Sequence, residues 1–269
     1  NVAMFHLFTH AFFKALLFLG SGSVIHSMND EQDIRNMGDL WKKMPFTWIA
    51  MIVGTLALTG FPLLSGYYSK DAIIEYAYLS QSSIGYIATA VGIITALLTA
   101  IYSWRLIFKT FHGKFNNKNI SKSKIKESGL SITIPLGILI LGSIFSGYIF
   151  KDLLIGKTNQ EFWGSSILIL KDFDHSLIPL WILYITPLLV VLAIPFSYYL
   201  FIKNQKYLDQ LIFNNKKIYK FLLNKWYFDE FYDTIFVIPV QKLGSFFWKS
   251  GDQKTIDRYG PDGISRLIR

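Results

Sequence analysis

The segment 2–28, VAMFHLFTHAFFKALLFLGSGSVIHSM, carries ionisable side chains inside an apolar run that is long enough to cross a membrane. A helix of about 20 apolar residues spans a hydrocarbon core of about 30 Å. His6, His10 and Lys14 are spaced four residues apart, which places them on one face of a helix. Ionisable groups at membrane depth are costly unless they face a protein interior or a wet cavity, and they commonly mark ion pathways. The segment therefore predicts a membrane protein that handles protons.

Composition supports a membrane protein and excludes several other classes. Hydrophobic residues make up 52% of the 269 positions and charged residues 17%, against about 25% charged residues in a soluble domain. Backbone groups in lipid must be paired within their own segment, so the spans should be helices. The chain has no cysteine, which excludes a disulfide framework, thiolate zinc sites and iron–sulfur clusters held by this chain. The net charge of +9 comes from basic loops beside the spans rather than from a nucleic-acid-binding surface.

Five membrane spans are expected, and the second of them should be broken. The spans run over residues 2–27, 46–79, 84–108, 130–150 and 177–202. The second is too long for one plain helix, and its segment 60–71, GFPLLSGYYSKD, contains two glycines and a proline that predict a break between two half-helices. The expected fold is an all-α, polytopic transmembrane helix bundle.

The charges of the loops give an orientation. Segments 109–128 and 203–225 each carry six lysines against one acidic residue, a net charge of +5. Loops 29–43 and 151–176 each have a net charge of −1. If the broken span crosses once, both basic segments lie on one face, which the positive-inside rule assigns to the cytoplasm or to the mitochondrial matrix.

We expect three regions along the chain. Residues 1–202 form the transmembrane part, 203–225 a basic connector on the cytoplasmic or matrix side, and 226–269 an amphipathic helix along the membrane surface or along other subunits. Within the last region, the glycine- and aspartate-rich segment 251–263 should be irregular. Because Asn1 stands directly before a span, we also expect the sequence to be a piece of a longer polypeptide.

The ladder of His6, His10 and Lys14 has two other interpretations. Lys14 could snorkel to the surface and the histidines could be ordinary core residues. However, Lys14 lies near the middle of its span, about 18 Å from either end, and a lysine side chain covers only part of that distance. The histidines could bind a metal or haem, but two ligands without cysteine or carboxylate partners nearby are too few. A proton path is therefore the preferred interpretation.

The expected break supplies a second group of candidates, Lys70 and Asp71. Ser69 is expected to cap the second half-helix and so to place Lys70 and Asp71 in its first turn. Half-helix ends at membrane depth commonly form ion sites, and a lysine beside a carboxylate can load and release a proton there. The alternative is an ordinary helix end at the membrane surface, which the apolar continuation IIEYAYL disfavours.

Glu75 and Arg105 are further candidates. Glu75 lies four residues after Asp71 and shares its helix face, so it could extend the path. Arg105, near the end of the third span, is better explained as a side chain that snorkels to the cytoplasmic surface beside Trp104, an interfacial anchor. No role is assigned to the histidines at span ends and in loops, His26, His112 and His175.

The same residues carry a resemblance to a known family. Three blocks resemble the antiporter-like proton-channel subunits of respiratory complex I: FHLFTHAFFKALLFLGSGSVIH (5–26), GTLALTGFPLLSGYYSKDAIIE (54–75) and NKWYFDEFYDTIFVIPVQKLG (224–244). The resemblance covers nearly the whole chain. The HxxxHxxxK ladder would also fit related Na⁺/H⁺ antiporter and membrane-bound hydrogenase subunits, whereas the tail favours the distal, largest channel subunit of complex I and its lateral helix.

The resemblance implies inverted repeats of five helices, each holding half of a channel, with this sequence corresponding to the second repeat. Lys14 would match the central lysine of that repeat, and His6 and His10 the histidines that lead to it. Lys70, with Asp71 beside it, would match the lysine at the broken helix that exchanges protons with the aqueous face. The first repeat, with its glutamate–lysine pair, and a last span beyond the lateral helix are missing from this sequence.

The resemblance also implies that protons move through this chain while electrons are transferred on other subunits. No redox cofactor or metal is expected on the chain itself, because NADH, FMN, iron–sulfur clusters and quinone would be bound elsewhere in the complex. The expected partners are other membrane-arm subunits and the lipid bilayer, with no nucleic acid. The expected location is the bacterial inner membrane or, alternatively, the mitochondrial inner membrane. A non-pumping membrane scaffold, whose tail ties neighbouring subunits together, is the other alternative.

Overall fold

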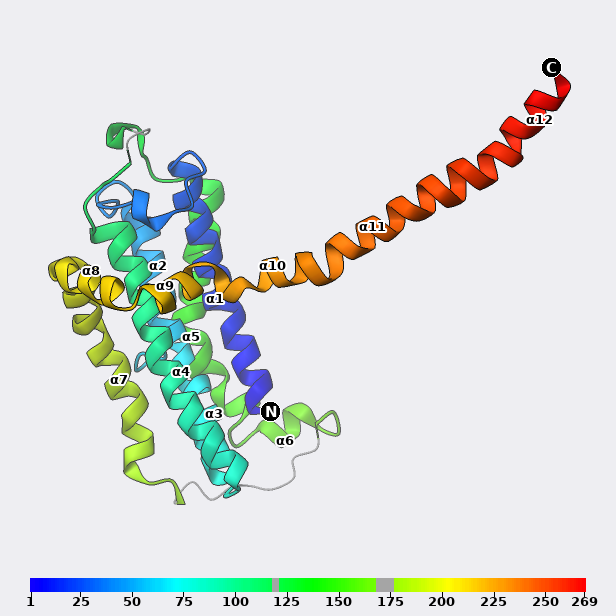
Figure 1. The fold of residues 1–269 in the computed structure, drawn as a ribbon. Coiled ribbons are helices and arrows are strands. Elements are labelled where there is room, and N and C mark those ends of the chain that lie inside the picture. Colours follow the sequence, from blue (N-terminus) through cyan, green and yellow to red (C-terminus); the bar gives the residue numbers. More distant parts are fainter. Residues whose placement is uncertain (118–120, 168–176) are drawn as a thin grey trace. The chain divides into compact units, whose positions relative to one another are not determined.

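The computed structural model describes residues 1–117, 121–167 and 177–269, is 81% helical and contains no strand among these residues. It divides into two compact units, Asn1–Gln205 and Lys206–Arg269 (Figure 1). The predicted all-α class of a membrane helix bundle is confirmed.

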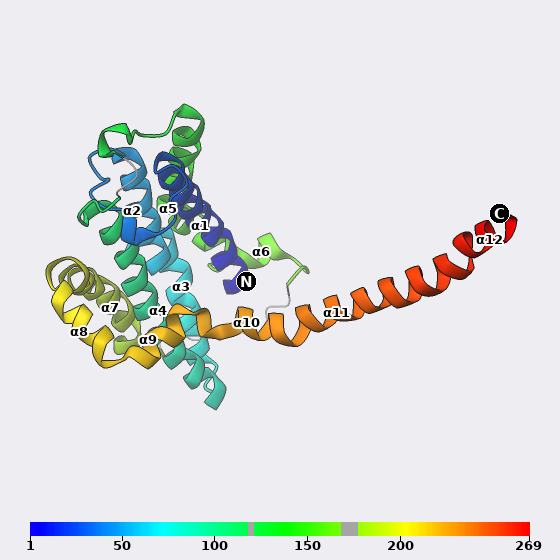
Figure 2. The same ribbon diagram turned by 45° about the horizontal axis from the view of Figure 1, so that its top comes forward.

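The first unit is a bundle of long helices. Its main elements are, in chain order, α1 (Val2–Ser27), α2 (Pro45–Thr59), α3 (Ser65–Leu79), α4 (Ser83–Ile107), α5 (Leu130–Leu154), α6 (Asn159–Trp163) and α7 (Leu180–Tyr198). Short π-helical turns, η2 (Phe108–His112) and η5 (Tyr199–Lys203), extend α4 and α7, and 3-10 turns form at η1 (Ile34–Asn36) and η3 (Lys122–Lys124). α1 and α5 pack on one side of the α2–α3 pair, and α4 packs on the pair and against α7 (Figure 1, Figure 2).

Five passes through this unit correspond to the five predicted spans. Four helices of the described chain are long and apolar enough to cross a membrane: Val2–Ser27, Ser83–His112, Leu130–Leu154 and Leu180–Lys203. The remaining pass consists of α2 and α3, which have 15 residues each and follow one another through the bundle (Figure 1). The second span is therefore broken, as predicted.

The exposure of side chains along α4 is the inverse of that in a soluble protein. Its buried positions are mostly small or hydroxyl residues: Gly85, Thr89, Ala96, Ala100 and Ser103. Large apolar side chains on the same helix point outward, and Ile87 and Ile94 are 64% and 58% exposed. Small residues let membrane helices approach one another closely, while large apolar side chains face the lipid. This arrangement fits an integral membrane protein.

Two loops meet at one end of the bundle. The Asn116 side chain donates a hydrogen bond to the carbonyl of Arg35 (3.3 Å), and Lys122 forms an ion pair with Asp39. The η5 turn packs against η2, so the chain also leaves α7 at this end. Both basic segments therefore begin at the same end, as the single crossing of the broken span requires.

Several residues counted in the loop charges lie outside the described residues: Lys118, Lys171, Asp172 and Asp174; His175 does as well.

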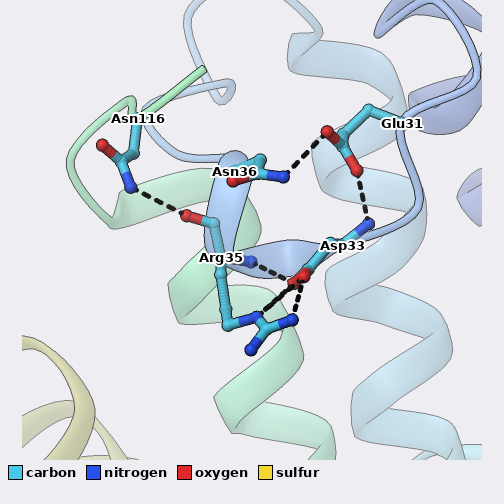
Figure 3. Close-up of polar contacts among 5 residues, drawn as sticks. All are labelled: Glu31, Asp33, Arg35, Asn36 and Asn116. Atoms are coloured by element: carbon cyan, nitrogen blue, oxygen red, sulfur yellow. Dashed lines mark hydrogen bonds and ion pairs between the residues drawn. The ribbon is translucent and has the colours of Figure 1, made fainter. Parts of the chain in front are cut away.

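A polar cluster orders the loop between α1 and α2 (Figure 3). The Arg35 side chain and amide donate hydrogen bonds to Asp33, while Glu31 accepts from the Asp33 amide and from the Asn36 side chain, both at 2.9 Å. The hydrogen bond from Arg35 lowers the pKa of the Asp33 carboxyl below its ordinary value. The resulting stabilisation is present at neutral pH and is lost as the pH falls through that lowered pKa. Because the pair is exposed, it contributes at most about 1 kcal/mol.

Glu127 supplies the N-terminal cap of α2 from a distant loop. The residue at the cap position of α2 makes no side-chain cap hydrogen bond of its own. The Glu127 carboxylate accepts hydrogen bonds from the amides of Phe46 (2.9 Å) and Thr47 (3.2 Å) and from the Thr47 hydroxyl (2.5 Å). The Ser23 hydroxyl of α1 lies 3.0 Å from that of Thr47 and 2.6 Å from that of Ser128. A carboxylate at the start of a helix accepts hydrogen bonds from the unpaired amides and is attracted by the partial positive charge there.

The second unit is a succession of helices. Its elements are α8 (Gln205–Asn214), α9 (Lys216–Leu223), η6 (Lys225–Tyr227), α10 (Phe228–Tyr232), η7 (Asp233–Val237), α11 (Ile238–Phe246), η8 (Phe247–Asp257) and α12 (Pro261–Ile268). Positive φ angles at Lys225, Trp226 and Tyr227 separate α9 from α10. The prediction that 251–263 is irregular is wrong, because η8 and α12 cover most of it. On an exposed helix, each glycine or aspartate costs only about 0.5–1 kcal/mol, which continued backbone pairing can offset.

Removing the Glu127 carboxylate should release the loop that carries it. We expect Glu127→Ala to lower the local free energy of opening by about 1–2 kcal/mol, because two amides of α2 lose their acceptor. The lysines of this loop are trypsin sites, so cleavage there should become roughly 5- to 30-fold faster under native conditions. Ser123→Ala, at an exposed position of the same loop, is the control and should cleave at the original rate. Unchanged cleavage of Glu127→Ala would show that the carboxylate does not hold the loop.

Candidate functional site

The break in the second span is made by five residues between two close-packed half-helices. α2 ends at Gly60, whose φ of +82° is in the left-handed region, and α3 begins at Ser65 after the extended residue Leu64. A Cβ atom on Gly66 would lie 1.7 Å from the carbonyl oxygen of Ala57. The start of α3 therefore rests directly on the end of α2, and only glycine fits at position 66.

Ser69 lies in the second turn of α3, so the prediction that it caps this helix is wrong. The close contact at Gly66 lets the helix restart at Ser65, and Leu64 takes the cap position. Lys70 and Asp71 consequently lie beyond the first turn, where the field of the helix end is weaker.

The side chain of Ser69 instead connects the broken span to the ladder on α1. Its hydroxyl is fully buried, accepts a hydrogen bond from the Thr9 hydroxyl (2.8 Å) and lies 3.0 Å from Nδ1 of His6. The ring of His10 follows, 5.7 Å from the His6 ring between centroids. Because a hydroxyl both donates and accepts, Ser69 can bridge groups on the two helices. We call this contact of His6, Thr9 and Ser69 the His6–Ser69 junction.

Lys14 is half-buried and lines a cavity of about 420 Å³ between α1, α2 and α4. Thr55, Tyr102 and Ser103 contribute to the cavity wall, and the buried Ser103 hydroxyl makes no hydrogen bond among the described residues. The ammonium of Lys14 lies 5.9 Å from the centre of the Phe18 ring. The ladder lysine thus faces a cavity with hydroxyl groups, as an ionisable group at membrane depth requires.

Lys70 and Asp71 both lie against the break. A Cβ atom on Gly60 would be 3.7 Å from Cδ of Lys70 and 4.0 Å from Oδ1 of Asp71. Asp71 is only 8% exposed, and neither of its carboxylate oxygens makes a hydrogen bond within the described chain. The charge of Lys70 acts on both Asp71 and His6. A buried carboxylate is costly without a neighbouring positive charge, and Lys70 supplies one.

Asp71 and Glu75 line a second cavity, of about 500 Å³, between α3 and the end of α5. Its wall also includes Tyr67, Tyr68 and Lys151. We call it the Asp71 pocket. It lies toward the end of the bundle opposite the basic loops, because α3 and α5 both run away from those loops (Figure 1).

Arg105 is not brought together with the other candidates. It is exposed at the end of α4, where its guanidinium lies 5.9 Å from the centre of the Phe201 ring. Its neighbour Trp104 is 5% exposed and stacks on Phe108, so the prediction that Trp104 is an interfacial anchor is wrong. Trp104 belongs to a buried apolar cluster that also contains Met37 and Ile125 from the two loops at this end, which the hydropathy of the sequence does not reveal.

His112 has a structural environment that the sequence did not indicate. It lies in the π-helical turn η2 rather than in a loop, accepts a hydrogen bond at Nε2 from Trp48 Nε1 (3.1 Å) and stacks on Trp41. No group of three or more histidine, aspartate or glutamate side chains in the described part of the chain is placed to hold a metal ion.

Three neighbours of the candidate residues were missed at the sequence level. Thr9 could have been found, because it lies three residues after His6 and therefore close to it on the helix surface. Tyr68 and Lys151 carry no such signal, since 83 positions separate them and only the packing of α3 against α5 brings them together.

Comparison with known proteins gives two adjoining matches. A family described as NADH:quinone oxidoreductase/Mrp antiporter, TM, matches residues 1–103. A second, described as NADH dehydrogenase subunit 5 C-terminus, matches residues 102–269.

Curated relatives align with the whole chain. NADH-ubiquinone oxidoreductase chain 5 of Chondrus crispus is 40% identical over 100% of this chain and 42% of its own length. The protein of the same name from Phytophthora infestans is 41% identical over 99% of this chain and 41% of its own length. NADH-quinone oxidoreductase subunit L of Rickettsia bellii (strain RML369-C) is 40% identical over 100% of this chain and 42% of its own length. The chain thus spans about two fifths of the length of these relatives.

The close approach of the half-helices can be tested at Gly66. Gly66→Ala should destabilise the protein by roughly 1–3 kcal/mol or more, because the new methyl group meets the backbone carbonyl of Ala57. Gly22→Ala is the matched control: it also lies within a helix, but a Cβ there meets nothing within 4 Å. It should be neutral or stabilising by up to about 1 kcal/mol. Thermal unfolding of both variants measures the difference, and equal midpoints would contradict the close contact.

Proposed function

The chain belongs to the NADH dehydrogenase subunit 5 family, and on this basis we propose that it translocates protons within the membrane arm of an NADH:quinone oxidoreductase. The proposed route runs from Lys14 through His10 and His6 to Lys70 and Asp71, and it is coupled to electron transfer in other subunits. The observation that carries the proposal is the His6–Ser69 junction, which puts the ladder on α1 in direct contact with the broken span.

The ladder has the chemistry of a proton relay. A neutral imidazole accepts a proton at one nitrogen while the other nitrogen donates, so neighbouring histidines can pass a proton along a helix face. Lys14 stands one turn beyond His10, and the charges of these two side chains interact. A proton held by Lys14 can therefore reach His6 through His10, with short rotations of side chains or water molecules that span the gaps.

The transfer between the two helices takes place at Ser69. Its hydroxyl contacts Nδ1 of His6 and belongs to the residue directly before Lys70. Lys70 receives the proton as an ammonium that Asp71 stabilises, and it gives the proton up when Asp71 is protonated in turn. A lysine and a carboxylate at a helix break form a pair whose charge state can alternate without a large net charge in the membrane.

The outlet in this proposal is the Asp71 pocket, with Glu75 as its outer carboxylate. The basic loops begin at the opposite end of the bundle, which the positive-inside rule assigns to the cytoplasm or matrix. Protons would then leave on the periplasmic or intermembrane side. Arg105, near the basic loops, is proposed as a surface residue rather than as part of the route.

Other subunits of the complex would carry out the redox chemistry. No redox cofactor acts on this chain; NADH, FMN, iron–sulfur clusters and quinone are bound by other subunits, and the energy arrives as a change of charge and conformation along the polar residues. The partners are other membrane-arm subunits and lipid, without nucleic acid. The membrane is the bacterial inner membrane or the mitochondrial inner membrane, and the names and organisms of the relatives support both.

Two other functions are favoured by particular observations. The description of the first matching family includes Mrp antiporters, which supports cation/proton antiport as an alternative, and a related hydrogenase subunit would use the same ladder. Sodium-dependent transport without NADH oxidation would favour the antiporter.

The second unit exposes large apolar side chains such as Phe228, Ile235 and Phe246. Such exposed side chains support a scaffold role for residues 226–269, as a lateral helix that follows the 203–225 connector and contacts neighbouring subunits.

The route can be tested at Lys14. The experiment uses the assembled complex in sealed vesicles. For each NADH oxidised, the number of protons that pass through this subunit should fall by at least about tenfold in Lys14→Ala, because the relay loses its central carrier. Lys126→Ala, an exposed lysine of the basic loop, is the control and should pump normally. Full pumping by Lys14→Ala would contradict the proposed function. Loss of assembly on deletion of 226–269, with no effect of Lys14→Ala, would favour the scaffold instead.

A further inference from the structure

Lys151 lies on the face of α5 that touches α3. Gly147, one turn before it, approaches α3 so closely that a Cβ atom there would lie 2.5 Å from Cα of Ser65 and 2.9 Å from Cδ2 of Tyr68. Residues four apart share a helix face, so Lys151 also projects toward α3. Its ammonium lies 5.7 Å from the centre of the Tyr68 ring.

A lysine in the last turn of a helix usually has a simpler explanation. It interacts with the free carbonyls of the helix end and extends toward water. Lys151 is likewise exposed, but its ammonium also lies beside the Tyr68 ring of α3, and the residue forms part of the wall of the Asp71 pocket. A cation near the face of an aromatic ring is attracted by the electrons of the ring, which favours this rotamer.

The wall of the pocket carries the carboxylates of Asp71 and Glu75 from α3 and the ammonium of Lys151 from α5. Lys70, which lies against the break and acts on the charge of Asp71, is the fourth charged group of this region. Further titratable groups on the packed elements are Tyr67, Tyr68 and Tyr76 of α3, Tyr148 and Asp152 of α5, Tyr184 of α7 and His6 behind Ser69. When Lys70 is neutral, Lys151 is the remaining ammonium of these four groups.

We propose that Lys151 is a positioning residue of the outlet, which places a positive charge on the wall of the pocket that Asp71 and Glu75 line, so that protons delivered by Lys70 leave toward the aqueous face. This inference rests on the proposed function. In the step it assists, the Lys70 ammonium transfers a proton to the Asp71 carboxylate, leaving a neutral amine and a carboxylic acid. The acid then releases the proton to water, directly or through Glu75, and returns to the carboxylate. Lys151 takes no part in the transfer itself and stabilises the returning negative charge electrostatically.

The test compares three variants of the assembled complex in sealed vesicles. Lys151→Met removes the charge but keeps most of the length, Lys151→Arg keeps the charge, and Lys157→Met removes an exposed charge from the following loop. The readout is the number of protons pumped per NADH oxidised as a function of pH on the outlet side. For Lys151→Met we expect pumping at neutral pH to fall roughly threefold to tenfold, and its dependence on outlet pH to move up by about one unit. Lys151→Arg and Lys157→Met should follow the wild-type profile.

Two results would overturn the inference: an unchanged pH profile in Lys151→Met, or equal losses in Lys151→Met and Lys151→Arg, which would indicate packing rather than charge. If Lys151→Met does not assemble, Tyr68→Leu removes the ring that holds the ammonium. It should move the profile in the same direction, and an unchanged profile would again overturn the inference. Failure of the proposed function is distinguishable, because it would appear as full pumping in Lys14→Ala whatever the Lys151 variants do.

Discussion

A polar side chain at membrane depth is stable only where a partner lies within reach, and in this chain the broken span supplies the partners. Gly66 rests on the carbonyl of Ala57, which lets α3 restart directly after the break and turns Ser69 toward α1. The buried Ser69 hydroxyl then satisfies Thr9 and contacts His6. Without that contact, the ladder on α1 and the Lys70–Asp71 pair would be two separate groups of costly side chains.

The two ends of the bundle differ in a way that gives the proposed route a direction. At one end, the loops are tied by the Asp39–Lys122 ion pair and by Glu127, which caps α2. At the other end, the Asp71 pocket brings carboxylates and Lys151 together between α3 and α5. One end is thus closed by hydrogen-bonded loops rich in lysine, and the other contains an acidic cavity. This asymmetry is what a pathway needs if protons are to leave on the face away from the basic loops.

Much of the fold was predictable because the bilayer imposes simple rules on sequence. Long apolar runs predicted the spans, and Gly60 together with Pro62 predicted the break. Four-residue spacing predicted that His6, His10 and Lys14 share a face. The errors concern contacts between distant segments. Ser69 is not a cap because α3 starts at Ser65. Trp104 is buried in an apolar cluster that includes side chains from two distant loops. The Glu127 cap and the Tyr68–Lys151 contact depend on packing between helices, which no local pattern encodes.

The central claim is that the ladder and the Asp71 pocket form one polar route through the His6–Ser69 junction. An experimental density map of the whole complex, at a resolution that shows ordered water, tests this most directly. We expect a continuous chain of polar side chains and water molecules from the Lys14 cavity through His10, His6 and Lys70 to the Asp71 pocket. Apolar side chains that separate Lys70 from the junction, or a lipid chain that fills the Lys14 cavity, would contradict it.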